Sequence, residues 1–296
     1  MYDVIIIGMG IGGITAGIYG KRAGLNVLMF EKSAPGGMLQ KIDKIQNYPG
    51  FSEISGPDLA LNLFNQVKKV GVPFKFEEVI DVEITEEYKK VITKNGSYEA
   101  KNVIVATGRT PKYLGLDNEK DYLGRGLSTC ASCDGNLYKG EDVAVVGSGN
   151  SALQESLYLA NIVNKVYILH RGVNFKGDDA LVERARNTQN IEIVDGVNIK
   201  KINEVDGKIE SVTLDNEKTI NVKGVFIYIG YKPDTDMFKK LDITNINGDI
   251  IVGENFETEI DGLYAIGDCA KKGVYQLVTA ASDGCIAVSD IEKIRN

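Results

Sequence analysis

Two glycine-rich segments, GMGIGG at residues 8–13 and GSGNSA at residues 147–152, constrain the fold of this chain more than any other feature. Each segment follows a short apolar run that is typical of a buried strand, and each opens a helical run that leads to a second strand. The expected strands are Asp3–Ile7, Asn26–Phe30, Asp142–Val146 and Lys165–Leu169, and the expected helical runs are Ile14–Ala23 and Leu153–Asn161. Between the two units, apolar residues on one face predict a further helix over Pro57–Val70. Because this order is that of a Rossmann unit, we predict an α/β protein with two Rossmann-like nucleotide-binding units.

The first glycine turn has the spacing that a bound dinucleotide requires. Gly8 makes the tight turn, Gly10 lets the backbone approach a pyrophosphate, and Gly13 allows the helix to pack closely on the strand. Glu31 stands at the end of the second strand, where a carboxylate accepts hydrogen bonds from ribose hydroxyls. The alternative is a glycine turn that binds nothing, but the strand, helix and acid together favour an adenine dinucleotide without a 2′-phosphate.

The second glycine turn keeps the spacing through Gly147, Gly149 and Ala152, but its second strand ends differently. His170 and Arg171 stand where the first unit has an acid. A base at this position accommodates the 2′-phosphate of NADP, so the two turns predict two different dinucleotides. The alternative for Arg171 is a solvated residue at the end of a strand.

The segment STCASCDG places Cys130 and Cys133 two residues apart, with Asp134 directly after them. A zinc site needs four ligands, and the other two cysteines, Cys269 and Cys285, lie in distant segments, so we expect no metal site. A purely structural disulfide would close a very small loop and would be reduced in the cytosol. The pattern therefore favours a redox pair, in which one thiolate is stabilised and the other resolves a mixed disulfide.

A redox dithiol needs a nearby group that donates and accepts protons. His170 is the only histidine and belongs to the second nucleotide unit, which leaves Asp134 as the nearest titratable side chain. From the sequence alone, a simple turn residue before Gly135 is an equally good interpretation of Asp134.

The composition excludes several classes of protein. The 296 residues, of which 43% are hydrophobic and 25% charged, suit two globular domains. A net charge of −7 gives no basic field for nucleic acid, and no apolar stretch approaches the ~18 residues of a membrane span. Four cysteines and a start without a signal-peptide pattern favour a cytoplasmic protein.

Further motifs make the chain resemble the low-molecular-weight, bacterial-type thioredoxin reductases over essentially its full length. In order along the chain, these motifs are GMGIGG, PGGML, QNYPG, VIVATG, CASCDG, GSGNSA, FIYIGYKPDT, GLYAIGDC and TAASDGC. The larger disulfide reductases match less well, because their CxxxxC motif and C-terminal catalytic histidine are both missing.

The resemblance implies an FAD-binding domain built from residues 1–113 and 243–296, with an NAD(P)-binding domain, residues 114–242, inserted in it. It implies a flavoprotein that passes electrons from NADPH through FAD and the cysteine pair to thioredoxin or a thioredoxin-like protein. In the family, the residue matching Cys133 faces the flavin and that matching Cys130 attacks the thioredoxin disulfide, while that matching Asp134 donates and accepts protons. A homodimer is implied as well.

The resemblance also implies a set of cofactor contacts. Those expected for FAD are Gly8, Gly10, Gly13, Glu31, Gly37, Asn47, Thr107, Gly108, Gly267, Asp268, Gln276, Thr279 and Ala280. Those expected for NADP are Gly147, Gly149, Asn150, Ser151, Ala152, His170, Arg171 and Lys176. Cys269 and Cys285 match no catalytic position and are expected to be small buried hydrophobes.

The chain departs from the family at the NADPH signature. The family pattern HRRxxxR is HRGVNFK here, so Gly172 replaces one arginine and Lys176 another. Each lost arginine–phosphate contact lowers affinity roughly ten- to a hundredfold, which makes NADH an alternative donor. Tyr275 also replaces an arginine, and Met38 replaces a glutamine that bonds the flavin.

Two further hypotheses follow from these departures. One is a relative that takes its electrons from ferredoxin and has lost the nicotinamide site; the retained GSGNSA segment and Arg171 argue against it. The other is a flavin-binding redox sensor or interaction module without turnover, against which the intact CxxC-Asp sequence argues.

Overall fold

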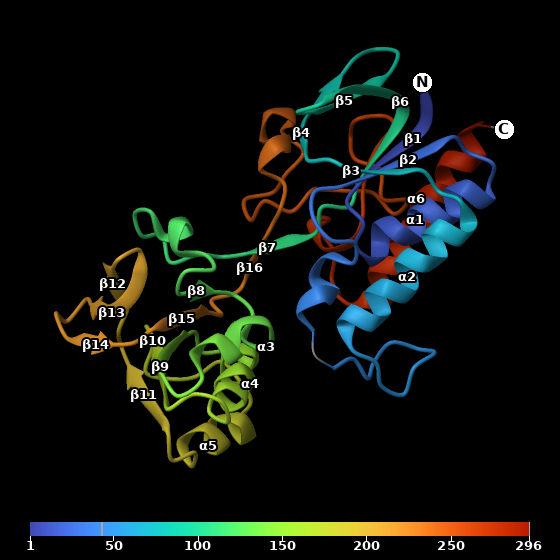
Figure 1. Ribbon diagram of the computed structural model, residues 1–296. Helices are drawn as coiled ribbons and strands as arrows, with labels where there is room; N and C mark the ends of the chain where they lie inside the picture. The colour runs from blue at the N-terminus through green and yellow to red at the C-terminus, as the bar shows by residue number, and fades with distance from the viewer. Residues whose placement is uncertain (43, 296) are drawn as a thin grey trace. The chain divides into compact units, whose positions relative to one another are not determined.

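The computed structural model describes residues 1–42 and 44–295 and divides into two compact units (Figure 1). The first unit is Met1–Thr110 together with the chain from Lys232 onward, and the second is Pro111–Tyr231. The chain passes between them through β7 (Arg109–Pro111) and β16 (Tyr231–Pro233), which form a two-stranded sheet.

The unit boundaries differ from those expected, which lay after residues 113 and 242. The second boundary lies earlier because the short helix η4 (Asp236–Leu241) packs on the first unit. Phe238 is fully buried in the apolar core of that unit, and Lys240 forms an ion pair there with Asp81 at 2.6 Å.

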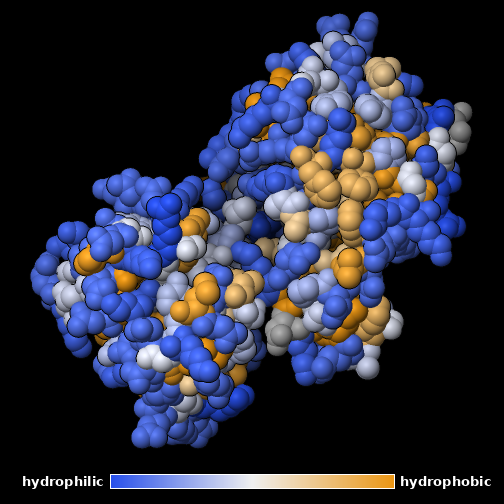
Figure 2. Space-filling view, in the orientation of Figure 1, coloured by the Kyte–Doolittle hydropathy of each residue, from blue (hydrophilic) through white to orange (hydrophobic). Residues whose placement is uncertain are grey.

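The surface of each unit is largely polar. On the face seen in Figure 2, hydrophilic residues cover most of both units, and apolar residues form separate small patches. Within residues 1–42 and 44–295, no helix is long and apolar enough to cross a membrane.

The first unit is built on a seven-stranded sheet in which β3, β2, β1 and β6 lie side by side in that order and are parallel. The strands are β1 (Tyr2–Ile7), β2 (Val27–Glu31), β3 (Phe74–Phe76), β4 (Val79–Ile84), β5 (Lys89–Thr93), β6 (Gly96–Val105) and β17 (Leu263–Ala265). The long strand β6 pairs with β5 antiparallel through its first half and with β17 parallel through its second half. The carboxyl ends of β1, β2, β6 and β17 therefore share one edge of the sheet.

Three helices accompany this sheet: α1 (Ile11–Arg22), α2 (Gly56–Val70) and α6 (Leu277–Arg295) (Figure 1). Helix α2 has clear signals at both ends. The Ser55 hydroxyl accepts a hydrogen bond from the N–H of Asp58, and Gly71 ends the helix with φ of 75°. These caps explain why the helix that we expected over Pro57–Val70 is confirmed almost residue for residue.

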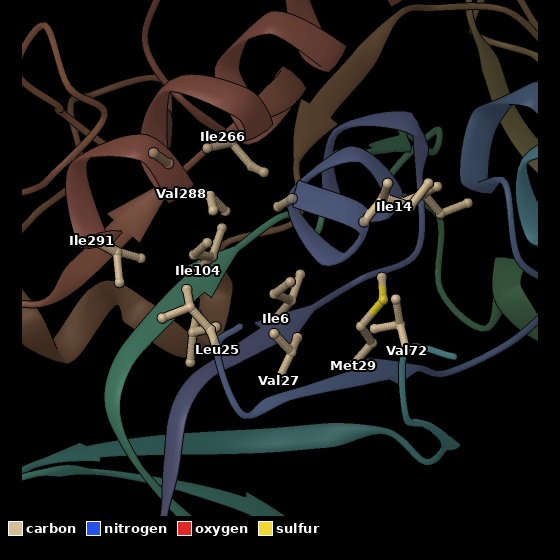
Figure 3. Packing of buried hydrophobic residues seen from close by; sticks show 14 of the residues in the cluster. Ile6, Ile14, Leu25, Val27, Met29, Val72, Ile104, Ile266, Val288 and Ile291 are labelled. Carbon is tan, nitrogen blue, oxygen red and sulfur yellow. The ribbon is translucent and has the colours of Figure 1, made fainter. Parts of the chain in front are cut away.

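The main core of the first unit lies where strands β1, β2 and β6 meet helices α1 and α6. Figure 3 shows side chains from these elements and from adjoining segments packed against one another, and those labelled are all buried. The labelled residues are Ile6, Ile14, Leu25, Val27, Met29, Val72, Ile104, Ile266, Val288 and Ile291. Strands β1 and β2 supply near-continuous apolar runs because the parallel part of the sheet is covered on both faces.

The second unit repeats the plan with a parallel sheet in the order β11-β10-β9-β15-β8. These strands are β8 (Leu127–Ser128), β9 (Asp142–Val146), β10 (Lys165–His170), β11 (Ile191–Asp195) and β15 (Gly224–Ile227). The helices are α3 (Ala131–Asp134), α4 (Asn150–Leu159) and α5 (Asp179–Arg186), and an antiparallel meander is formed by β12 (Ile199–Val205), β13 (Lys208–Leu214) and β14 (Thr219–Asn221). The meander buries apolar residues such as Ile199, Ile202 and Ile220 in the core of this unit.

Helices α1 and α4 begin earlier than expected, at Ile11 and Asn150 rather than at Ile14 and Leu153. The last three residues of each glycine motif already belong to the helix. Gly10 and Gly149 are the N-cap residues, with extended backbone angles that precede the first helical turn.

Helices α1 and α6 approach so closely that a glycine is needed between them. A Cβ atom on Gly284 would lie 2.4 Å from the carbonyl oxygen of Gly12 and 2.9 Å from the backbone nitrogen of Ala16. We expect Gly284→Ala to lower the free energy of unfolding by about 1–3 kcal/mol, because backbone must move to admit the methyl group. Denaturant unfolding measures this loss.

The control is Gly273→Ala. Gly273 lies in an exposed loop, and no described atom beyond its chain neighbours stands within 4 Å of its would-be Cβ. This variant should change stability by less than about 0.5 kcal/mol. Equal stability of the two variants would contradict the close contact of α1 with α6.

Candidate active site

The first glycine turn joins β1 to α1 and is tightly packed on its protein side. Gly8 has φ of 107°, and a Cβ there would lie 2.4 Å from the carbonyl oxygen of Ala106. A Cβ on Gly13 would lie 2.0 Å from the carbonyl oxygen of Gly8. Around Gly10, by contrast, no described atom beyond the chain neighbours comes within 4 Å of a would-be Cβ. The turn is therefore open on the side of Gly10.

Helix α1 begins beside this opening with backbone N–H groups that no described side chain caps. Its first turn contains no acidic residue. Free N–H groups and the helix dipole both favour an anion at this end, and an open glycine allows the backbone to approach it. These residues fit the pyrophosphate of a dinucleotide such as FAD.

Thr107 and Gly108 follow β6 at the same edge of the sheet. The hydroxyl of Thr107 is buried and has no hydrogen-bond partner in the part of the chain that the structure describes. Burial of an unpaired hydroxyl costs free energy, so a polar ligand atom beside it accounts for its position. Gly108 has φ of 68°, and its carbonyl accepts a hydrogen bond from the N–H of Asp234 at 3.0 Å.

Glu31 ends β2 and supports the glycine turn. Its Oε2 accepts a hydrogen bond from the N–H of Met9, and its Oε1 accepts one from the N–H of Ser33, both at 2.9 Å. The carboxylate therefore ties the turn to the segment that follows β2. Oε1 also accepts a hydrogen bond from the Ser33 hydroxyl at 3.3 Å, whereas Oε2 retains a second lone pair, which a ribose hydroxyl can use.

Residues predicted for FAD binding from distant parts of the chain lie together. The side-chain amide of Asn47 donates to Oε1 of Gln276 at 3.2 Å, across 229 sequence positions. The hydroxyl of Thr279 accepts from the N–H of Gln276 at 3.1 Å, at the start of α6. A Cβ on Gly37 would lie 3.6 Å from the Cα of Gly10, so the segment after β2 also borders the glycine turn.

Gly267 and Asp268 follow β17 and meet the start of α6. The N–H of Gly267 donates to Oδ2 of Asp283 at 2.9 Å, and Lys272 pairs with the same oxygen at 2.7 Å. A Cβ on Gly267 would lie 3.9 Å from the Cβ of Ala280. Burial raises the pKa of Asp268, against the lowering effect of nearby cations. The residues expected to bind FAD thus gather at one edge of the sheet of the first unit.

The cysteine pair lies in the second unit and forms a disulfide. The two sulfur atoms of Cys130 and Cys133 are 2.01 Å apart, and the Cα atoms are 5.3 Å apart. Cys130 is the N-cap of the one-turn helix α3 and is only 7% exposed, whereas Cys133 is exposed. The two sulfurs therefore differ in accessibility.

Asp134 ends α3 and is held by a hydroxyl that the sequence analysis missed. Ser128 donates a hydrogen bond to Oδ2 of Asp134 at 2.6 Å and accepts one from the N–H of Cys130 at 3.0 Å. Ser128 is buried. It stands two residues before the cysteine pair, so its position in STCASCDG was a usable signal.

Tyr228 is a second residue that the sequence analysis missed. Its hydroxyl accepts a hydrogen bond from the N–H of Ala131 at 2.7 Å, although the two residues are 97 positions apart. Burial raises the pKa of Tyr228, so it remains a neutral phenol. No local motif could have indicated this contact, because it depends on the sheet order that brings β15 beside β8.

The second glycine turn has the geometry of the first. Gly147 has φ of 149°, and a Cβ there would lie 2.4 Å from the carbonyl oxygen of Tyr228 and 2.9 Å from the Cβ of Ala152. Gly149 is the N-cap of α4, and no described side chain caps this helix. No described atom beyond the chain neighbours of Gly149 lies within 4 Å of its would-be Cβ. This turn also fits a pyrophosphate.

The loop after β10 folds back onto the second turn. The N–H of Lys176 donates to the carbonyl of Ser148 at 2.8 Å. The side chain of Asn150 accepts from the N–H of Asp178 at 2.7 Å and donates to its carboxylate at 3.0 Å. Ser151 is exposed in the first turn of α4. The loop thus brings the backbone of Lys176 beside the glycine turn.

His170 ends β10 and Arg171 follows it, and the two side chains have different environments. The imidazole of His170 is buried, its Nε2 lies 2.6 Å from Oδ1 of Asp195, and its ring packs on Phe175 with centroids 4.4 Å apart. Arg171 and Lys176 are exposed. Of the three side chains expected at a 2′-phosphate, two are therefore accessible cations, and His170 is bonded to a carboxylate that the sequence analysis missed.

The remaining cysteines are free. Cys269 is fully buried, and burial raises the pKa of its thiol. Cys285 is only half-buried, which corrects the expectation that both would be buried; it lies on α6 between the buried Gly284 and the exposed Ile286. Among the described residues, no group of three or more His, Cys, Asp or Glu side chains could hold a metal ion.

Comparisons with known proteins agree with this geometry. Residues 2–284 match the family described as pyridine nucleotide-disulphide oxidoreductase. A thioredoxin reductase from Bacillus subtilis is 39% identical over 297 residues, which cover 99% of this chain and 94% of the relative.

Solved structures show the same relationship. The thioredoxin reductase of Lactococcus lactis has a TM-score of 0.88 at 33% identity, over 99% of this chain and 98% of that chain. A ferredoxin-flavin thioredoxin reductase from Clostridium acetobutylicum has a TM-score of 0.55 at 30% identity, over 99% and 98% of the two chains. The chain therefore belongs to the pyridine nucleotide-disulphide oxidoreductase family and, within it, to the low-molecular-weight bacterial thioredoxin reductases.

Proposed function

We propose that this thioredoxin reductase passes electrons from NADPH or NADH, through bound FAD and the Cys130–Cys133 disulfide, to a thioredoxin-like protein. The observation that carries the proposal is the disulfide with Asp134 directly beside it, in the same unit as an uncapped glycine turn. Bound FAD supplies the two-electron chemistry that links a nicotinamide to a disulfide. The family resemblance supports a homodimer, and the low cysteine content supports a cytoplasmic location.

Reduction of the disulfide to two thiols takes up two electrons and two protons. Asp134 follows Cys133 directly, and Ser128 bonds only one of its carboxyl oxygens. The other oxygen is left to exchange a proton with a cysteine sulfur. We therefore assign proton transfer to Asp134, with its carboxyl group fixed in orientation by Ser128.

Transfer to the thioredoxin-like protein follows thiol–disulfide exchange. The Cys130 thiolate attacks one sulfur of the disulfide to be reduced, so that a mixed disulfide forms and the second sulfur of that protein leaves as a thiolate. The Cys133 thiolate then attacks the Cys130 sulfur, which restores the internal disulfide and releases the reduced protein. Because Cys130 is only 7% exposed, its attack requires a change in what covers its sulfur.

The electron donor depends on the residues around the second glycine turn. Arg171 and Lys176 are exposed cations near that turn and favour NADPH, whose 2′-phosphate is dianionic. Gly172 contributes no charge where the family has arginine. We therefore propose NADPH as a donor that binds weakly and is only slightly preferred over NADH.

Gly172→Arg combined with Lys176→Arg should tighten NADPH and leave NADH nearly unchanged, because only NADPH carries the additional phosphate. One bidentate arginine–phosphate contact is worth roughly tenfold in affinity or more. The measurement is the steady-state KM for both nucleotides in both proteins at one ionic strength, together with bleaching of the flavin absorbance. A wild-type KM for NADPH in the low micromolar range, with NADH inert, would show that the altered signature has no effect.

Electron donation by ferredoxin is the second candidate function. It is favoured by the likeness to the ferredoxin-flavin thioredoxin reductase of Clostridium acetobutylicum and by Gly172. Flavin reduction by reduced ferredoxin, but by neither nucleotide at millimolar concentration, would establish it. Flavin reduction that never yields free thiols on Cys130 and Cys133 would instead indicate a redox sensor or interaction module.

Cys130 and Cys133 should have unequal roles. We expect Cys130→Ser to leave a Cys133 thiolate beside the flavin, visible as a long-wavelength charge-transfer band. Cys133→Ser should lack this band but accumulate a mixed disulfide with thioredoxin, because the resolving thiol is absent. Identical flavin spectra in both variants, with no trapped thioredoxin in either, would contradict these unequal roles.

Asp134→Asn should slow proton transfer at the cysteine pair while flavin binding is retained. General acid–base help is commonly worth about 10²–10⁴-fold, and dithiol reoxidation followed by stopped flow measures the loss. Asp179→Asn, an exposed acid on α5 of the same unit, is the matched control and should react as the wild type does. A loss below about threefold in Asp134→Asn would leave Asp134 as a turn residue only.

A further inference from the structure

Asp195 is an acidic residue placed where a site for a 2′-phosphate needs positive charge. It ends β11, which pairs in parallel with β10 so that Asp195 lies opposite His170 in the sheet register. Its Oδ1 is 2.6 Å from Nε2 of His170. About half of the Asp195 side chain is exposed, while that of His170 is almost fully buried. The Asp195 carboxylate therefore lies at the surface, beside the end of β10.

The strand end is the position that distinguishes the two kinds of dinucleotide. In a Rossmann unit, the residues that end the second strand face the adenosine ribose and its 2′ substituent. In the second unit this strand is β10, and His170 is its last residue. The loop from Gly172 to Lys176 follows and returns to the glycine turn. A charge that is hydrogen-bonded to His170 therefore acts on the same substituent.

The hydrogen bond between His170 and an ionised Asp195 limits the net charge of the pair to zero or −1. An ionised carboxylate only accepts hydrogen bonds, so Nε2 of His170 must donate and carries a proton whether the ring is neutral or charged. If the ring is charged, the pair has no net charge; if the ring is neutral, the pair has a charge of −1. In neither case does His170 with Asp195 supply a net positive charge to a phosphate.

The other side of the imidazole has no compensating group. Nδ1 of His170 is buried and has no hydrogen-bond partner among the residues that the structure describes. A Cβ on Gly172 would lie 3.9 Å from this nitrogen. The family has an arginine at this position, so this chain lacks a cationic side chain beside Nδ1. The neighbouring acid on β11, Glu192, is already paired with Lys165 at 2.6 Å.

We propose that Asp195 is a specificity-determining residue, whose carboxylate cancels the cationic contribution of His170 and so lowers the preference of the second unit for NADPH over NADH. This inference rests on the proposed use of the second unit as a nicotinamide nucleotide site. Weak discrimination between NADPH and NADH is then caused by the presence of Asp195 as well as by the absence of the two arginines of the family signature.

The test compares Asp195→Asn with the wild-type holoenzyme. The amide keeps the size and hydrogen-bonding capacity of the side chain but removes its charge, which makes the site more positive by one unit in either protonation state of His170. The probes are adenosine 2′,5′-bisphosphate and 5′-AMP, which differ by the 2′-phosphate, followed by NADP⁺ and NAD⁺. Isothermal titration calorimetry gives each Kd without any need for turnover.

We expect Asp195→Asn to tighten adenosine 2′,5′-bisphosphate and NADP⁺ by roughly three- to tenfold, and to change 5′-AMP and NAD⁺ by less than about twofold. The gain should shrink as salt is raised, because the carboxylate is half exposed. Glu192→Gln is the matched control, since it removes one negative charge from the same strand away from its end, and it should leave all four Kd values near those of the wild type.

Three results would overturn the inference. One is equal tightening of all four probes, which would indicate a general structural effect. Another is no change in any Kd while thermal unfolding shows that Asp195→Asn is folded. The third is an equal effect of Glu192→Gln. Failure of the proposed donor chemistry is seen separately: NADP⁺ or NAD⁺ would bind, but neither reduced nucleotide would reduce the flavin. If no probe bound to either protein, both the proposed donor function and the role of Asp195 would be overturned.

Discussion

The candidate site depends on the missing side chains where each glycine turn meets its sheet. A Cβ on Gly13 would lie 2.0 Å from the carbonyl oxygen of Gly8, and one on Gly147 would lie 2.4 Å from that of Tyr228. Because these atoms are absent, α1 and α4 can begin at the carboxyl edge of their sheets with their first N–H groups uncapped by any described side chain. Glu31, Thr107, Gly267 and His170 are positioned by strands that end at the same edges. The hydrophobic core serves this arrangement by holding each helix against its sheet.

Much of the fold was predictable because the glycine spacing and the apolar runs are local signals. The strand predicted over Asp142–Val146 is confirmed with the same bounds, and α2 begins one residue before the predicted Pro57. In the structure the second unit ends at Tyr231, because Phe238 enters the core of the first unit. Which core receives Phe238 is decided by tertiary packing, which no local pattern specifies, although Gly230 and Pro233, on either side of the end of the second unit, are local turn signals.

The site was predictable where function requires particular residue types at fixed spacing. Asn47 and Gln276 were both expected near FAD, and the structure joins them by a hydrogen bond. The groups that position the reactive residues were missed. Tyr228 reaches the cysteine pair across 97 positions, and Asp195 reaches His170 across 25, in both cases through pairing of neighbouring strands. Tyrosine and aspartate are common residues, so only the sheet order distinguishes Tyr228 and Asp195 from the other tyrosines and aspartates of the chain.

The ends of β2 and β10 show why a charged residue in a motif does not by itself define the charge of a site. Both Glu31 and His170 are buried at the end of the second strand of their unit. Glu31 is held by backbone N–H groups, which are neutral donors, so the full negative charge of the carboxylate remains at the first site. His170 is held by Asp195, an ionisable acceptor, so any positive charge on the imidazole is balanced within 2.6 Å. The first strand end therefore keeps the charge that its sequence predicts, whereas the second has the charge of a pair whose other member lies on β11.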